Sequence, residues 1–298
     1  MLHLLDAARH PRPGSGSPGP QRVATHFLRC LRHLDTFRRW YGDDGNPALQ
    51  RELAARPYLV TCVVHPYLHG GWHPERRLEV IRTHYSLMRG ALALLHAPGP
   101  AWLAGTAEGL HLRLDRPGKF EHEGESTLHL CQGEDTLYSI AFTLGLSEAT
   151  PLAASAPSGL LAYVGALQGL HDPAALERYR HLTHQLHGLR PRDLLLTAFR
   201  LLCTSLGVAR ILAVGNAQRV SSNRHYAASD QVHASYDEAW QDAGGTETAE
   251  GFFELASCPV RRSPDQVPVR KRALYRRRYE LLDALARDIA HGVRQRTP

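Results

Sequence analysis

A glycine and two arginines stand directly before a strongly apolar segment, in the sequence HGLRPR. Gly188 and Arg190 precede a proline, and Arg192 follows it. Proline in a first helical turn marks a helix start, and a helix N-terminus presents free N–H groups and a partial positive charge. Arginine adds charge-assisted, bidentate contacts to phosphate. We therefore expect a phosphate-binding site made of His187, Gly188, Arg190 and Arg192, with an ordinary helix start and an Arg192–Asp193 pair as the alternative.

The end of a strand is expected to belong to the same cofactor site. Residues 160–167 form an apolar segment typical of a strand, and Gln168 and Gly169 follow it. Glycine lets a ligand approach the backbone closely, and Gln168 offers a polar side chain. The alternative is a strand that simply ends in a glycine turn.

A polar segment after residues 208–214 holds the candidate catalytic residues. It contains Asn216, Asn223, His225 and Tyr226. Loops at strand ends often carry function. Transfer of an acyl group to an amine needs a base for the ammonium proton and an acid for the leaving group. His225 can serve as the base and Tyr226 as the acid, and a polar surface loop is the alternative.

Six basic residues gather at the start of a long amphipathic segment, residues 268–292. Such a helix can bind nucleic-acid phosphate or anionic lipid. A packed helix with a solvated basic face is the commoner arrangement. The six candidate contact residues are Arg270, Lys271, Arg272, Arg276, Arg277 and Arg278.

Composition and spacing disfavour several classes of protein. The chain has 298 residues, a formal net charge of +6 and 5 cysteines. No C-x-x-C occurs, so a reduced, cytoplasmic protein without a disulfide framework is expected. No apolar run reaches the length of a transmembrane helix. The 19 histidines include no H-E-x-x-H, and P-loop, dinucleotide-binding and hydrolase motifs are missing, so we expect no metal site and none of those chemistries.

The order of the patterns predicts an α+β fold. Residues 1–20 are expected to form a flexible leader, 21–105 a helical N-terminal region, and 106–298 a mixed, largely antiparallel sheet flanked by helices and ending in the basic helix. Short links between period-two segments favour an antiparallel meander. Helices are expected over 21–56 (with a break at 42–47), 74–95, 176–186, 190–206, 237–243 and 268–292, and strands over 110–114, 126–131, 137–144, 160–167, 208–214 and 251–256.

Several segments are similar to the VirK/YbjX family of bacterial proteins, catalogued as domain of unknown function 535. The segments are RLEVIRTHYSLM (77–88), LYSIAFTLG (137–145), LLAYVGALQG (160–169), HGLRPRDLLL (187–196), RILAVGNAQRV (210–220), HASYDEAW (233–240) and RKRALYRRRYELLDAL (270–285). The resemblance implies links to virulence, envelope integrity and resistance to antimicrobial peptides. It also makes His84 and Tyr85 functional candidates, although a histidine on an apolar helix face is more often a hydrogen-bonded core residue.

The C-terminal part also resembles the GNAT acyltransferase superfamily in architecture. In that superfamily two long antiparallel strands lead to a phosphate-cradling loop, a helix faces the donor, and the next strand splays away. The corresponding pieces here are 137–145, 160–168, 187–192, 191–206 and 208–214, although the superfamily's Q/R-x-x-G-x-G/A loop is replaced by HGLRPR.

Two functions from different classes follow. The first is a GNAT-like acyl- or aminoacyltransferase that forms an amide or ester in a specialised biosynthetic pathway, with acyl-CoA or aminoacyl-tRNA as co-substrate and no tightly bound cofactor. Its partners would be a small-molecule or peptide acceptor and, for the second donor, tRNA. The second is a non-catalytic adaptor at the inner membrane surface, binding anionic lipid or a protein through the basic helix.

Overall fold

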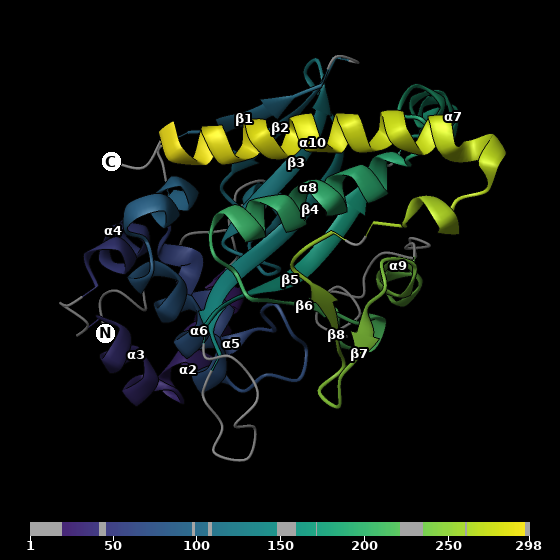
Figure 1. Cartoon of the computed structure of the whole chain (residues 1–298). Helices are drawn as coiled ribbons and strands as arrows, with labels where there is room; N and C mark the ends of the chain where they lie inside the picture. The colour runs from purple at the N-terminus through teal and green to yellow at the C-terminus, as the bar shows by residue number, and fades with distance from the viewer. Residues whose placement is uncertain are drawn as a thin grey trace.

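The computed structural model describes residues 20–41, 46–96, 99–106, 109–147, 159–170, 172–220, 235–259 and 261–295. These residues form a mixed eight-stranded sheet with helices packed on it (Figure 1), which confirms the α+β class. The order across the sheet is β1-β2-β3-β4-β5-β6-β8-β7. The strands are β1 (Ala101–Gly105), β2 (Leu110–Asp115), β3 (Ser126–Gln132), β4 (Asp135–Leu146), β5 (Leu160–Gly169), β6 (Arg210–Val214), β7 (Thr246–Glu247) and β8 (Phe252–Ala256).

The two faces of the sheet carry different layers. Alternate residues of a strand point to opposite faces, and the neighbours Phe142 and Thr143 of β4 show which layer lies on each. The Phe142 ring contacts Phe199 of α8 (Pro191–Ser205), with ring centroids 5.0 Å apart. Thr143 lies within hydrogen-bond distance, 2.8 Å, of the Tyr67 hydroxyl in the N-terminal region. We call these the α8 face and the N-terminal face.

Helices of the C-terminal part cover the α8 face. In Figure 1, α10 (Arg272–Gln295) lies along α8 and extends over β1. Gly292 of α10 packs so closely on the backbone of Leu103 that an added Cβ would lie 2.8 Å from the Leu103 oxygen. The remaining helices here are α7 (Ala175–Gln185) and α9 (Tyr236–Asp242).

The N-terminal region is helical, as expected, but more broken. Its helices are α2 (Pro20–Leu31), α3 (Leu34–Tyr41), α4 (Pro47–Ala55), α5 (Thr61–Val64) and α6 (Pro74–Ser86). Asn46 caps α4 by accepting a hydrogen bond from the Leu49 N–H. One continuous cluster of buried apolar side chains joins this region to the sheet. The expected division of the chain at residues 105 and 106 stays a prediction.

Three local expectations need correction. The helix expected over 74–95 ends at Ser86, and a 3-10 turn over Gly90–His96 follows, where Gly90 takes a φ of 53°. The short edge strands β1 and β7 were not expected, because five and two residues are too few to show a period. The link from β2 to β3 is not tight either: it holds a 3-10 turn whose Phe120 packs on Ala141 and Ala166.

None of the described helices is long and apolar enough to cross a membrane.

Candidate functional site

Strands β5 and β6 form the one parallel pair among the described strands, and they pair only at their beginnings. Leu161–Val164 face Arg210–Ala213 in register. β6 then ends at Val214, whereas β5 continues to Gly169. On its other side β5 carries a bulge, because the register with β4 shifts between Ala141 and Phe142. The second half of β5 therefore has no strand partner on the β6 side.

A tyrosine of α9 fills part of this opening. The Leu167 backbone N–H donates a hydrogen bond to the Tyr236 hydroxyl at 2.9 Å. The Arg219 guanidinium lies 3.8 Å from the centre of the Tyr236 ring, close enough for a cation–π contact. Burial raises the pKa of Tyr236 to about 12, so the phenol is neutral at neutral pH and keeps its proton to donate.

The start of α8 opens into a hollow of about 480 Å³. His187 and Gly188 have φ values of 54° and 76° and turn the chain into the helix. The His187 carbonyl accepts two hydrogen bonds from Arg278 of α10, at 2.8 and 3.2 Å, so α10 forms one wall. The charged residues lining the hollow are Arg190, Arg262, Lys271, Arg278, Asp193 and Asp242, and Gly188, Leu274 and Tyr275 complete it.

The two expected phosphate-binding arginines have different surroundings. Arg190 is 67% exposed in its side chain and lies 4.0 Å from Asp242. Arg192 is held by Asp242 at 2.8 Å and Asp193 at 3.1 Å, so the pairing with Asp193 given as its alternative is present. The hydrogen bond from Arg192 lowers the pKa of the Asp242 carboxyl. Arg190 therefore has more freedom to meet a ligand, and a binding role for Arg192 stays a prediction.

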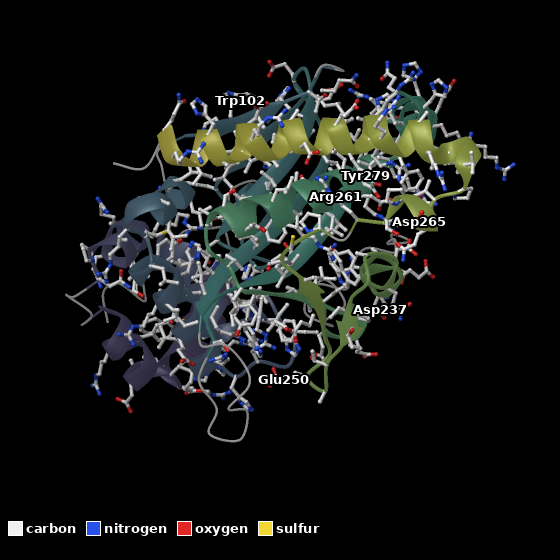
Figure 2. All side chains as sticks on the ribbon, viewed as in Figure 1. Trp102, Asp237, Glu250, Arg261, Asp265 and Tyr279 are labelled. Atoms are coloured by element: carbon white, nitrogen blue, oxygen red, sulfur yellow. The ribbon has the colours of Figure 1, made fainter. Side chains whose placement is uncertain are left out.

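The basic start of α10 joins the same region. Lys271 and Arg278 line the hollow at α8, and Arg272 and Arg276 line a neighbouring hollow of about 580 Å³. Arg262 and Tyr275 belong to both. Figure 2 shows Arg261 and Tyr279 side by side in the larger hollow, with the guanidinium 5.2 Å from the ring centre. Of the expected contact residues, Arg270 and Arg277 lie outside both hollows and are exposed.

Gln168 and Gly169 lie apart from the hollow at α8. They line a third cavity of about 470 Å³, together with Arg113, Lys119, His129 and Ser139. Gln168 pairs in register with Ser139, which lies on the same face of β4 as Thr143, the N-terminal face. The structure thus separates the expected cofactor residues onto two faces of the sheet.

Asn216 holds the base of the loop that contains the other catalytic candidates. Its Oδ1 accepts from the Tyr236 N–H at 2.9 Å, and its Nδ2 donates to the Ser235 hydroxyl at 3.0 Å. Its backbone N–H donates to Asp237 at 2.7 Å. These contacts join the two ends of segment 221–234 and cap α9. Asn223, His225 and Tyr226 lie outside the described residues.

His84 and Tyr85 are buried, at 1% and 3% exposure. The Leu144 N–H donates to His84 Nδ1 at 3.1 Å. Tyr85 donates to Glu125 at 2.5 Å, and Arg56 binds the same carboxylate at 2.7 Å. Burial and the Glu125 charge raise the pKa of Tyr85. These contacts agree with the core role given as the alternative, and a role in positioning a nucleophile stays a prediction.

Sequence reasoning missed two residues that the fold places at these sites. Tyr236 was visible only as a member of the segment HASYDEAW, and nothing in the spacing indicates that it reaches Leu167. Arg262 lies in a segment without a clear sequence pattern. Only the tertiary packing of this segment places it beside Arg190 and Lys271. Within the described residues, no three His, Cys, Asp or Glu side chains are grouped so that they could hold a metal ion.

Comparison with known proteins identifies the family to which the chain belongs. The family described as "Protein of unknown function (DUF535)" matches residues 20–291, and the chain belongs to this family. It is 30% identical over 255 residues to "Uncharacterized protein YbjX" of Escherichia coli, covering 82% of this chain and 74% of that protein.

Two uncharacterized proteins of Haemophilus influenzae match shorter parts. One is 28% identical over 158 residues and the other 30% identical over 126 residues. These matches span 53% and 42% of this chain, and 49% and 41% of the relatives. No solved structure matches the chain. The comparisons therefore supply a family and no activity.

Proposed function

We propose that this protein is a GNAT-like acyl- or aminoacyltransferase whose phosphate-bearing donor lies in the hollow at the start of α8. The observation that carries the proposal is the meeting of Arg190, Lys271 and Arg278 with Gly188 around one cavity at a helix N-terminus. Arg262 adds a fourth cation, against the two carboxylates Asp193 and Asp242. A cationic concavity at a helix start favours phosphate over a neutral ligand.

The neighbouring hollow suits the rest of such a donor. It continues from the first through Arg262 and Tyr275, and it contains the rings of Tyr275 and Tyr279. Aromatic rings and arginines together favour nucleotides, because bases stack on rings while phosphates bind guanidinium groups. Both coenzyme A and the end of a tRNA carry a base and phosphates. Contacts of this kind bind the sugar–phosphate backbone of a nucleic acid and do not distinguish its base sequence.

The chemistry would take place where β5 and β6 part. An amine or hydroxyl of the acceptor attacks the donor's acyl carbonyl, the bond from that carbon to the donor's sulfur or oxygen breaks, and the departing group takes up a proton. Holding both substrates in place and moving that proton would supply most of the rate, without a covalent enzyme intermediate. Asn216 and Ser235, which flank segment 221–234, are joined by a hydrogen bond beside Tyr236, whose hydroxyl lies in this opening.

Donor binding tests the proposal directly. Purified protein is heated with acetyl-CoA, longer acyl-CoAs or total charged tRNA, and a bound donor should raise the melting temperature by mass action. The double variant Arg190→Ala/Lys271→Ala should remove this shift. Arg270→Ala/Arg277→Ala is the matched control, since it removes two exposed charges outside both hollows. If no donor shifts the wild type, or both variants behave alike, the donor site is wrong.

One observation favours the adaptor as a second candidate. Val269 is 76% exposed and Leu274 37% exposed, beside the exposed Arg270 and Lys271. Apolar side chains among cations suit an anionic membrane surface. The adaptor should sediment with anionic vesicles but not with neutral ones, should lose this binding in high salt or with Val269→Ser, and should ignore every donor.

A further inference from the structure

A row of polar side chains crosses the N-terminal face of the sheet. Arg113 of β2 faces His129 of β3, His129 faces Ser139 of β4, and Ser139 faces Gln168 of β5. Residues directly opposite each other on antiparallel strands project from the same face. The row therefore forms one continuous polar floor. Trp102 of β1 pairs with Arg113 and continues the row, with the Arg113 guanidinium 5.7 Å from its ring centre.

This floor lies under the cavity of about 470 Å³. The segment from Asp115 to Phe120 forms an opposing wall and contributes Arg116 and Lys119. The volume lies within the roughly 300–1,000 Å³ of small-molecule sites. A hollow that combines a built floor, several charges and this volume has the make-up of a ligand site.

Two buried polar atoms of the floor have no hydrogen-bond partner within the described residues. They are Arg113 Nε, a donor, and Gln168 Oε1, an acceptor, and they lie in the two outer members of the row. Buried polar groups in native proteins are nearly always paired, so each unpaired one calls for water or a ligand. A ligand that pairs both atoms must offer a hydrogen-bond acceptor to Arg113 Nε and a hydrogen-bond donor to Gln168 Oε1.

The charges are distributed unevenly along the cavity. Arg113 Nε itself lies 3.7 Å from an Asp115 carboxylate oxygen, an ion pair too long to be a hydrogen bond, and Arg116 is held by Glu52 at 2.6 Å. Lys119 makes a cation–π contact with Phe120, 5.1 Å from its ring centre, and is exposed.

The other half of the floor is uncharged. His129 Nδ1 lies 2.8 Å from the Ser139 hydroxyl, and burial, aided by the Arg113 charge, lowers the pKa of His129 to about 4. The cavity thus has a cationic end at Arg113 and Lys119 and a neutral hydrogen-bonding end at Ser139 and Gln168.

We propose that this cavity binds a free amino acid or a closely related small amino-carboxylate. The carboxylate would meet Arg113 and Lys119, and the ammonium group would donate to Gln168 Oε1. A simple anion would satisfy Arg113 and leave Gln168 unpaired, whereas a zwitterion satisfies both.

Binding is measured without any donor, so the result does not depend on the transferase proposal. The purified full chain is titrated with each proteinogenic amino acid, and the best ligand is compared with its amide, its 2-hydroxy acid analogue and inorganic phosphate. We expect at least one amino acid to bind, and the amide and the hydroxy acid to bind at least tenfold more weakly. The proposal is overturned if no amino acid binds, or if phosphate or the hydroxy acid binds equally well.

Variants locate the site. Lys119→Ala and Gln168→Leu should each weaken binding about tenfold, the loss of one charge-assisted or buried hydrogen bond. Lys119 is exposed, so its replacement does not threaten folding. Arg287→Gln, at an exposed position of α10, is the control and should bind like the wild type. Unchanged binding in both Lys119→Ala and Gln168→Leu would contradict the placement.

Discussion

The Tyr236 hydroxyl accepts a hydrogen bond from the Leu167 backbone N–H, where β5 has lost its neighbour on the β6 side. A backbone N–H in a sheet normally donates to the next strand, and a buried one without an acceptor is costly. The phenol takes the place of that missing strand as the acceptor for the Leu167 N–H.

Replacement of Tyr236 by Phe should destabilise the protein. The variant keeps the ring but leaves the Leu167 N–H without its acceptor, which costs about 1–3 kcal/mol. Urea unfolding of both proteins measures the difference. Tyr275→Phe, at a half-buried position of α10 where the hydroxyl has only a long 3.4 Å contact with Arg262, should change the free energy of unfolding by less than about 0.5 kcal/mol. Equal stability of Tyr236→Phe and the wild type would mean that the bond is absent in solution.

The buried Glu125 carboxylate should be more important for stability than any surface ion pair. It accepts hydrogen bonds from Arg56, Tyr67 and Tyr85. Glu125→Ala would leave the buried Arg56 charge without one of its two carboxylate partners, and we expect a loss of about 3–5 kcal/mol. Glu79→Ala removes the exposed pair with Arg76 at 2.9 Å and should cost about 0–1 kcal/mol. Comparable losses in the two variants would refute the buried network.

Stability should fall as the pH drops below about 6.5, in part because of His129. Its folded pKa of about 4 lies below the usual histidine pKa of 6.5, so the unfolded chain binds a proton at a higher pH than the folded chain does. Between these values the folded state loses up to about 3 kcal/mol from this group. Arg113 and Lys119 oppose its protonation and Asp115 favours it.

The measurement is urea unfolding at pH 7 and pH 5 of the wild type and of His129→Gln. The stability lost between the two pH values should be smaller in the variant by about 2 kcal/mol, since 1.5 pH units lie within the window. Identical losses would mean that His129 is protonated as easily in the folded protein as in the unfolded chain.

Gly165→Ala should disrupt the packing of the β2–β3 link on the sheet. Gly165 lies at the bulge of β5, and an added Cβ would lie 2.1 Å from the Glu123 carbonyl oxygen. Backbone must move to relieve that contact, and we expect a loss of at least about 1–3 kcal/mol. At Gly159 a Cβ would make an ordinary 3.5 Å contact. Gly159→Ala is therefore the control, and thermal unfolding that ranks the two variants the other way would contradict the close approach.

The local elements follow from short-range patterns in the sequence. Apolar periodicity and the position of Pro191 are enough to place α8, and Gly133 at φ 58° marks the turn between β3 and β4. Both signals act over a few residues, where the sequence itself contains the cause. Patterns of this kind placed most of the strands and the basic helix. They failed at β1, β7 and the end of α6, where the segments are short or packing decides the conformation.

Contacts between residues far apart in the chain could not be predicted from such local patterns. Arg278 binds the carbonyl of His187, and Tyr85 meets Glu125 through the packing of α6 on the sheet. Gln168 and Arg190 were grouped as one site from the sequence, yet they line cavities on opposite faces.

The sequence by itself determined the class of fold, which residues carry charge, and where many helices and strands begin and end. These properties depend on hydrogen bonding and side-chain periodicity, which are local. Only the tertiary structure decided which arginines surround a hollow and which are neutralised by a neighbouring carboxylate. The physical reason is that contact energies between distant segments depend on how the whole chain packs, and no single segment carries that information.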